Sequence, residues 1–255
     1  IGNNPVNGGL VRLPGPDRVV EVTTGYSHTC VLISNGRVTC WGYGANGELG
    51  TGTTATIGDD ETAAANPANG GSVRLPSGQG AVDVSAGSFH TCALLVGGEI
   101  TCWGYGGDGA LGYGNTNNIG DNETPAANPA NFGIVILPSG RTAVAIAAGD
   151  THTCAILDNG AVSCWGDGSD GRLGYGNTLP IGDNEDPSGE TNTGGLVSLP
   201  GGKGAVAIDA AGASTCAILT TGRVTCWGSG ANGRLGYGNT NAIGDNETPA
   251  TNPVS

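Results

Sequence analysis

The sequence contains few basic residues and no long apolar run. Nine lysines and arginines stand against 22 acidic residues, which gives a formal net charge of −13. Because this charge repels phosphate backbones and anionic membrane surfaces, we expect no nucleic-acid partner. No apolar stretch reaches the roughly 18 residues of a membrane-spanning helix, so we expect no membrane insertion. No signal peptide is visible, and the start at Ile1 suggests a mature or excised segment.

Amphipathic helical periodicity is missing as well. In its place the chain has 50 glycines and 13 prolines, together with many Asn, Asp and Thr residues, which are the residues of tight turns. Short apolar segments lie between these turn residues. The composition therefore predicts an all-β chain with many turns.

Cysteine and tryptophan recur at one fixed interval. The motif His90-Thr-Cys-Ala-Leu-Leu-Val-Gly-Gly-Glu-Ile-Thr-Cys-Trp-Gly104 occurs four times with a period of 62 residues, which indicates a repeat protein whose units pack on their neighbours. The three series are Cys30, Cys92, Cys154 and Cys216, then Cys40, Cys102, Cys164 and Cys226, then Trp41, Trp103, Trp165 and Trp227. We expect one repeat array over 1–255, with units 4–65, 66–127, 128–189 and 190–251, and with 252–255 returning to the starting phase.

Each unit is expected to form one four-stranded antiparallel blade. The first strand is of the Val11–Leu13 type and ends at a proline, which cannot donate to a ladder. The third and fourth strands form a hairpin that turns at glycine and carries both cysteines. The second strand alternates with period two, and we expect its apolar residues to face the core. These residues are Val20, Val22, Val82, Val84, Val144, Ile146, Val206 and Ile208.

The eight cysteines form four equivalent pairs. Residues ten apart on either side of a hairpin turn face each other across the two strands, so each pair is expected to form a disulfide. Zinc is the alternative, but one pair per unit would require two units to share a metal, and the short spacing of zinc knuckles is missing. Disulfides imply an oxidising compartment, and hence an extracellular or cell-surface location.

The residues around each cysteine pair follow a distinctive order. Across 28–50 and 214–236 it approximates His-Thr-Cys-Ala-Leu, a glycine turn, Val-Thr-Cys-Trp-Gly and then Asn-Gly-x-Leu-Gly. This order resembles the regulator of chromosome condensation repeat, also known as the alpha-tubulin suppressor-like repeat, and the resemblance covers all four units. It implies four-stranded blades around the axis of a β-propeller, normally seven of them. The cysteine-paired variety is similar to secreted bacterial members.

Two departures from that family affect the expected function. Four units leave open whether the blades close on themselves, belong to a larger ring or polymerise. The family's namesake is a nucleotide exchange factor for a small GTPase on chromatin. This acidic, disulfide-bearing chain is not expected to share that activity.

Each unit also contains an acidic loop of the type Ile-Gly-Asp-Asn-Glu. Carboxylate and amide oxygens are the ligands that calcium prefers, so calcium is the one cofactor to consider. We favour the simpler interpretation that these loops are Asx-turns, because their spacing is neither that of an EF-hand nor that of a nonapeptide calcium repeat. The calcium candidates are Asp59, Asp60, Glu61, Asp121, Asn122, Glu123, Asp183, Asn184, Glu185, Asp245, Asn246 and Glu247.

Three histidines occupy the same repeat position, where the fourth unit has Ser214. They are His28, His90 and His152. Their repetition argues against a single catalytic centre. A metal site around a shared axis is one interpretation, but we expect each histidine to bond a neighbouring backbone group instead. The tryptophans are expected to pack between blades rather than to bind sugars.

No nucleophile with a plausible base and no phosphate-loop or zinc-protease motif is visible. The units differ at the position after Trp-Gly, and variable loops on a rigid scaffold predict a binding surface at Tyr43, Tyr105, Asp167 and Ser229. The leading hypothesis is a non-enzymatic extracellular scaffold that binds a protein or assembles with copies of itself into a surface or filamentous structure. The alternatives are a secreted propeller-type inhibitor of a partner enzyme and, less favoured, a polysaccharide-active enzyme.

Overall fold

Four small antiparallel sheets make up the computed structural model, which describes residues 10–65, 71–189 and 194–252. We call these sheets blades 1 to 4 in chain order. Each blade has three strands in sequential order. The strands are β1 (Val19–Thr24), β2 (His28–Ile33), β3 (Val38–Gly42), β4 (Ala81–Ala86), β5 (His90–Leu95), β6 (Ile100–Gly104), β7 (Ala143–Ala148), β8 (His152–Leu157), β9 (Val162–Gly166), β10 (Ala205–Ala211), β11 (Ser214–Leu219) and β12 (Val224–Gly228).

The helices of the described residues are all single 3-10 turns of three or four residues, so none is long or apolar enough to cross a membrane. They lie outside the strands, and all except η2 begin or end with proline or glycine. They are η2 (Ala63–Ala65), η4 (Pro76–Gly78), η5 (Gly107–Gly109), η6 (Pro125–Ala127), η7 (Ala130–Gly133), η8 (Pro138–Gly140), η9 (Ser169–Gly171), η10 (Pro187–Gly189), η11 (Pro200–Gly202), η12 (Ala231–Gly233) and η13 (Pro249–Thr251).

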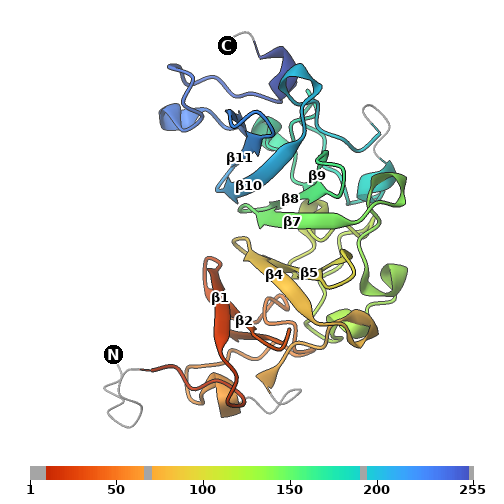
Figure 1. Ribbon diagram of the computed structural model, residues 1–255. Helices are drawn as coiled ribbons and strands as arrows, with labels where there is room; N and C mark the ends of the chain where they lie inside the picture. Colours follow the sequence, from red (N-terminus) through yellow and green to blue (C-terminus); the bar gives the residue numbers. More distant parts are fainter. Residues whose placement is uncertain (1–9, 66–70, 190–193, 253–255) are drawn as a thin grey trace.

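The blades follow one another along an open arc (Figure 1). The first strand of each blade packs against the first strand of the next, so that β1 contacts β4, β4 contacts β7 and β7 contacts β10. Blades 1 and 4 lie at the two ends of the arc, with blades 2 and 3 between them. The described part of the chain is thus a row of similar junctions with one uncovered face at each end.

The expected first strand of each unit is an extended segment with no ladder of its own. Residues 72–75 make one backbone bond to the preceding blade, from Val73 N–H to the Val38 carbonyl oxygen, 2.9 Å. Val135 and Val197 make the same bond to Ile100 and Val162. Pro76, which lacks an N–H, then starts η4 and prevents further pairing. The four-stranded blade is therefore corrected to three strands plus a segment supplied by the following repeat.

A bulge changes which face the first strand buries. The register shifts between Ala81 and Asp83, and at the same place in the other three blades. Val82 is consequently 55% exposed while Val84 is 2% exposed, although strict alternation would put both on one face. The expectation of core burial is wrong at Val20, Val82, Val144 and Val206, which are exposed in all four blades, and it is also wrong at Val22 on the end of the arc.

The cysteine hairpins form as expected. Cys30 pairs with Cys40 in the register of β2 and β3, and the corresponding residues pair in the other blades. All four pairs form disulfides, with Cα–Cα distances of 4.1 Å. On the chain-entropy model, each such short loop contributes about 2–3 kcal/mol to the stability of its blade. The zinc alternative is thereby overturned.

Tryptophan and glycine fit together at each junction between blades. The Trp103 indole N–H donates to the Glu48 carbonyl oxygen of blade 1, 2.9 Å. A Cβ atom added at Gly50 would lie only 3.0 Å from the Trp103 ring, so the position has room for glycine alone. The same pairing joins Gly112 to Trp165 and Gly174 to Trp227. The expected packing of tryptophan between blades is confirmed at these three junctions.

Two tyrosines fasten the extended segments to the strands beside them. The Tyr113 hydroxyl accepts from the Cys102 N–H at 2.9 Å and lies 3.1 Å from the Gly133 carbonyl oxygen. Tyr175 repeats this arrangement with Cys164 and Gly195. Because burial raises the pKa of Tyr113, its hydroxyl keeps its proton and serves as a fixed bridge.

Candidate functional site

The four variable residues after Trp-Gly all lie beside the first connection of their own blade. The Tyr43 N–H donates to the Ser27 carbonyl oxygen, 2.8 Å. The corresponding pairs are Tyr105 with Phe89, Asp167 with Thr151, and Ser229 with Ala213, at 2.8 to 3.0 Å. We call this set of loops the loop face, comprising 25–27 and 43, 87–89 and 105, 149–151 and 167, and 211–213 and 229. One surface therefore carries all four predicted residues.

Backbone bonds between neighbouring blades hold the loop face together. The Tyr26 N–H donates to the Ser88 carbonyl oxygen at 3.1 Å, Ser88 donates to Asp150 at 3.1 Å, and Asp150 donates to Gly212 at 2.9 Å. The Ser88 hydroxyl adds a bond to an Asp150 carboxylate oxygen, 2.7 Å. Main-chain hydrogen bonds thus fix the positions of these loops. The side chains can therefore differ from blade to blade without moving the loops.

Aromatic side chains gather on the half of the loop face formed by blades 1 and 2. The Tyr26 ring lies against the Phe89 ring, with centroids 5.8 Å apart and planes at 46°. Tyr26 is 78% exposed, and Phe89, Tyr43 and Tyr105 are also exposed. Glycine at 107 makes room for the Tyr105 ring, which a Cβ atom there would strike. We call these four residues the aromatic patch.

The other half of the loop face is acidic and internally paired. Asp167 forms an ion pair of 2.9 Å with Arg172, whose guanidinium also donates to the Thr151 hydroxyl at 2.8 Å. Burial alone would raise the pKa of Asp167, but hydrogen bonds from Ser169 and the charge of Arg172 hold it below its ordinary value. Asp167 therefore holds its own loop in place through these contacts.

Sequence reasoning missed Tyr26 and Phe89, whose rings pack against each other at a tilt in the aromatic patch. Both lie in the connection between the first two strands of a blade, one residue apart in repeat phase. The available signal was variation at this connection, which reads Gly-Tyr-Ser in blade 1 and Gly-Ser-Phe in blade 2. The two rings meet only because the blades are adjacent.

The acidic loops of blades 2 to 4 lie between blades. The Gly52 N–H donates to the Gly120 carbonyl oxygen at 3.0 Å, and Gly176 does the same to Gly244. A Cβ atom at Gly47 would lie 2.5 Å from the Ile119 carbonyl oxygen, so two backbones meet there. These contacts give the acidic loops of blades 2 to 4 a packing role.

The printed hydrogen bonds inside the acidic loops join adjacent residues, not residues two apart as in the expected Asx-turns. The Asp59, Asp121 and Asp245 carboxylates each accept from the next backbone N–H, at 3.1, 2.9 and 3.0 Å. Among the described residues, Asp59, Asp60 and Glu61 form the one acidic group whose ligand atoms all lie within 4.8 Å of one another. A hydrogen bond with Asp60, followed by burial, raises the pKa of Glu61. Calcium stays a prediction, best suited to this first loop.

The histidines join blades rather than gathering into a centre. The ring Nε2 atoms of His28, His90 and His152 lie 2.8, 2.9 and 2.8 Å from the hydroxyl oxygens of the next blade's threonines, which are Thr91, Thr153 and Thr215. The expected backbone partner is therefore corrected to a side chain. Burial lowers the pKa of His28 to about 4 and those of His90 and His152 to about 3, so all three are neutral.

The four blades are joined by one recurring type of junction. This arrangement defines a repeat protein of the β-propeller type. Two models of the Regulator of chromosome condensation (RCC1) repeat match the sequence, one over 19–48, 81–110 and 143–172, the other over 35–94 and 97–156. Together the matches run from residue 19 to residue 172, more than half of the chain. The chain belongs to the RCC1 repeat family, whose repeats are generally non-catalytic scaffolds.

Two larger proteins are similar to it in sequence. The Ultraviolet-B receptor UVR8 of Arabidopsis thaliana is 34% identical over 225 residues, which are 88% of this chain and 44% of that protein. The human E3 ubiquitin-protein ligase HERC2 is 30% identical over 221 residues, which are 86% of this chain and 4% of that protein. The chain spans less than half the length of either relative.

Solved structures support the fold. Human WBSCR16 superposes with a TM-score of 0.70 at 20% identity, over 94% of this chain and 54% of that one. A chain in the structure of Kap60 bound to yeast RCC1 (Prp20) gives a TM-score of 0.66 at 17% identity, over 96% of this chain and 51% of that one. The open arc thus corresponds to about half of each of these structures.

Proposed function

We propose that this chain is an extracellular or cell-surface repeat scaffold that binds a protein partner through its loop face. The observation that supports the proposal most directly is the aromatic patch. Tyrosine and phenylalanine are enriched in protein interfaces, and a pair of exposed rings held on a fixed backbone loses little entropy on binding. Within the described residues, the hydroxyl groups of Tyr26, Tyr43 and Tyr105 form no hydrogen bond, so they are available to a partner.

The disulfides support the proposed location. A protein with four disulfides is stable in an oxidising compartment, whereas cytosolic reductants keep most thiols reduced. The location fits the cysteine-paired, secreted bacterial kind of RCC1 repeat that the sequence resembles. A partner enzyme held by the loop face would make the chain an inhibitor of the kind considered above.

The test is capture of a binding partner from native culture medium under oxidising conditions. The wild-type chain is compared with the double variant Tyr26→Ser/Phe89→Ser, and Val144→Ser on blade 3 serves as the control because it is exposed but lies outside the loop face. We expect the double variant to lose at least about 10-fold in recovery, since aromatic anchors carry much of an interface's energy. Equal recovery by both variants would remove the aromatic patch from the proposal.

Self-assembly is the second candidate, because one type of junction recurs between successive blades and is suited to joining further units of the same kind. A contact between two different faces of identical copies grows into a ring or a filament. Scattering measurements at increasing protein concentration test this candidate independently of the loop face, since the residues involved are different.

A further inference from the structure

Seven of the nine basic residues lie on one face of the molecule. We call it the hairpin face, because it contains the turns of the cysteine hairpins and the segments that lead into the first strand of each blade. It comprises 12–18, 34–37, 74–80, 96–99, 136–142, 158–161, 198–204 and 220–223. We infer that the hairpin face binds an acidic segment of a second protein. This surface is separate from the loop face, so the inference goes beyond the proposed function.

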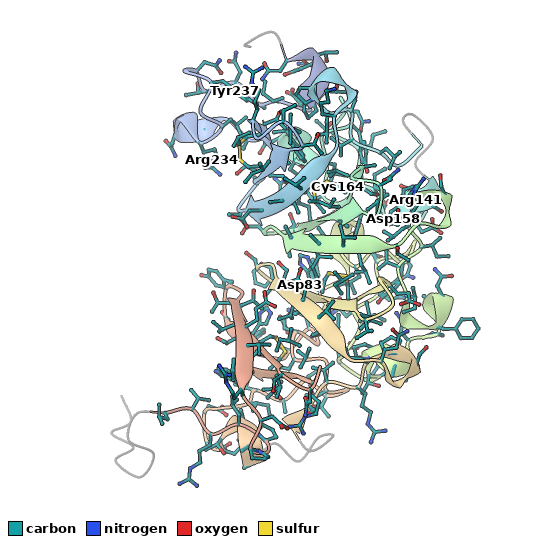
Figure 2. All side chains as sticks on the ribbon, viewed as in Figure 1. Asp83, Arg141, Asp158, Cys164, Arg234 and Tyr237 are labelled. Carbon is teal, nitrogen blue, oxygen red and sulfur yellow. A yellow bond between two sulfur atoms is a disulfide. The ribbon has the colours of Figure 1, made fainter. Side chains whose placement is uncertain are left out.

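The hairpin face lies at the ends of the strands opposite to the loop face. In blade 2 the Val96 N–H of the hairpin turn donates to the carbonyl oxygen of Gly80, the residue before β4, at 3.0 Å. Corresponding bonds of 2.8 to 2.9 Å join the turn to the first strand in the other blades. In Figure 2 Arg141 and Asp158 lie on one side of the arc, and Arg234 lies on the other. The same strands therefore end at two separate surfaces.

Charge is distributed unequally between the hairpin face and the rest of the chain. The basic residues of this face are Arg12, Arg18, Arg37, Arg74, Arg141, Lys203 and Arg223. Its acidic residues, three of the 22 in the chain, are Asp17, Glu99 and Asp158. The hairpin face thus has a formal net charge of +4 in a chain whose net charge is −13. Because salt screens charges beyond about 8–10 Å, a partner in contact with this face experiences its local positive charge.

Acidic residues of the hairpin face bond to neighbours on the same face. The Asp17 carboxylate accepts from the Asn35 amide nitrogen at 2.8 Å, and Asp158 forms an ion pair of 2.9 Å with Arg141. The basic residues of this face that form no ion pair within the described part of the chain are Arg18, Arg74, Lys203 and Arg223. Their positive charge is therefore available to the carboxylates of a partner.

Two arginines line an open pocket of about 410 Å³ between blades 1 and 2. Arg37 and Arg74 contribute to its wall together with Asn35 and Gln79. The Arg37 guanidinium is held in place by a bond to the Pro14 carbonyl oxygen, 2.9 Å. Its Nε atom is shielded from solvent and forms no hydrogen bond within the described residues. Since guanidinium groups form their strongest hydrogen bonds with carboxylates, this pocket is suited to an acidic side chain.

The composition of the hairpin face favours a protein over other polyanions. Six of its seven basic residues are arginine, which is enriched in protein interfaces, whereas lysine is depleted there. Apolar side chains are exposed among them, since Val96 is 69% and Ile136 is 39% exposed. Both lie at blade 2, which has a blade on each side. A nucleic acid or a sulfated polysaccharide gives such side chains little to pack against, whereas an acidic protein segment with apolar residues matches both features.

The test measures the binding of a fluorescein-labelled synthetic peptide of alternating glutamate and leucine residues to the full oxidised chain, by fluorescence anisotropy. Arg74→Gln and Arg141→Gln should each raise the Kd about 3-fold, and together at least about 10-fold, since each removes one exposed charge pair. Val96→Ser should weaken binding as well, because it removes an apolar contact. Arg234→Gln is the matched control, since it removes the same charge outside the hairpin face, and it should bind like wild type. All four residues are exposed, so the variants should fold, which thermal melting verifies.

A peptide with glutamine in place of glutamate should bind at least about 10-fold more weakly, since it lacks the charge. An equal loss in Arg234→Gln would show that overall charge governs binding and would overturn the inference. Tighter binding of a sulfated oligosaccharide than of the acidic peptide would overturn the choice of a protein. Wild-type dimers that disappear in the Arg74→Gln/Arg141→Gln variant would overturn it in favour of a second copy. Because the aromatic patch lies outside the hairpin face, each of these failures would leave the proposed function standing.

Discussion

The inner junctions and the end faces carry the same kinds of residue in opposite environments. Trp103 and Trp165 are fully buried, whereas Trp41 is half-exposed on the end of blade 1. Val162 is buried, whereas Val224 is largely exposed on the end of blade 4. The local strand geometry is the same in each case. Burial in this molecule is therefore decided by the neighbouring blade.

The largest test of this comparison is one substitution made at two positions. Trp103→Ala should lower the free energy of unfolding by about 3–5 kcal/mol, because it leaves a cavity and removes the bond to the Glu48 carbonyl. Trp41→Ala should cost only about 1 kcal/mol, since this side chain already contacts solvent. Urea unfolding followed by circular dichroism measures both.

Dilute protein is needed for that comparison, because association at the ends would bury Trp41. Equal costs for the two variants in dilute solution would show that the neighbouring blade does not determine the contribution of tryptophan. A cost at Trp41 that grows with protein concentration would instead point to pairing between copies.

A smaller effect is expected from pH, which acts on the histidines of the junctions. The folded pKa of His90 is about 3, below the roughly 6.5 of an unfolded histidine, so the unfolded chain takes up a proton first as the pH falls. The contribution of the neutral histidine to the free energy of unfolding is fully present above about pH 6.5. It is lost progressively toward pH 3, and the loss reaches about 2 kcal/mol per histidine at pH 5.

Glu21 opposes this trend, because burial and the charge of Asp83 raise its pKa to about 7. Its folded form gains a proton first, so it favours folding as the pH falls through 7 toward about 4.5. The contribution of the histidines is therefore measured as the change in melting temperature from pH 7 to pH 5 in the Glu21→Gln background, where this carboxyl group no longer titrates. Adding His90→Gln should flatten the curve, and two parallel curves would contradict the assignment.

The smallest effect concerns calcium at the end of blade 1. We expect calcium to stabilise the chain by about 1 kcal/mol or less through Asp59, Asp60 and Glu61, since one weak site adds little. Asp59→Asn/Asp60→Asn should abolish this response in a thermal melt with and without chelator. Asp121→Asn, in a loop packed between blades, should leave it intact. An unchanged melting temperature in wild type would contradict calcium binding at this loop.

Most of the fold could be read from local patterns in the sequence. The 62-residue period, the cysteine hairpins and the tryptophan packing all depend on residues within one motif or its repetition, and all three are found. The bulge beside Val82 was missed because one extra residue in a strand leaves no compositional trace. The expected first strand does not form for a different reason, because its partner β3 lies in another repeat and Pro76 ends the pairing after one bond.

The candidate site was only half predictable. Tyr43 and Tyr105 stand out because they vary at a fixed position, and the structure puts both on the loop face. Tyr26 and Phe89 meet across two blades from positions that are out of phase by one residue. Contacts of this kind depend on the angle between blades, which no single repeat encodes. The threonine partners of the histidines were missed for the same reason.

The extended segment that each repeat lends to the blade before it has an evolutionary consequence. A recombination event that adds or removes a full 62-residue period, wherever its breakpoints fall, restores every segment to a neighbour of the proper kind. The gene can therefore change its number of blades in single steps without passing through a product whose strands lack partners. Blade number becomes a readily selectable trait, while the chemistry of each junction is inherited unchanged.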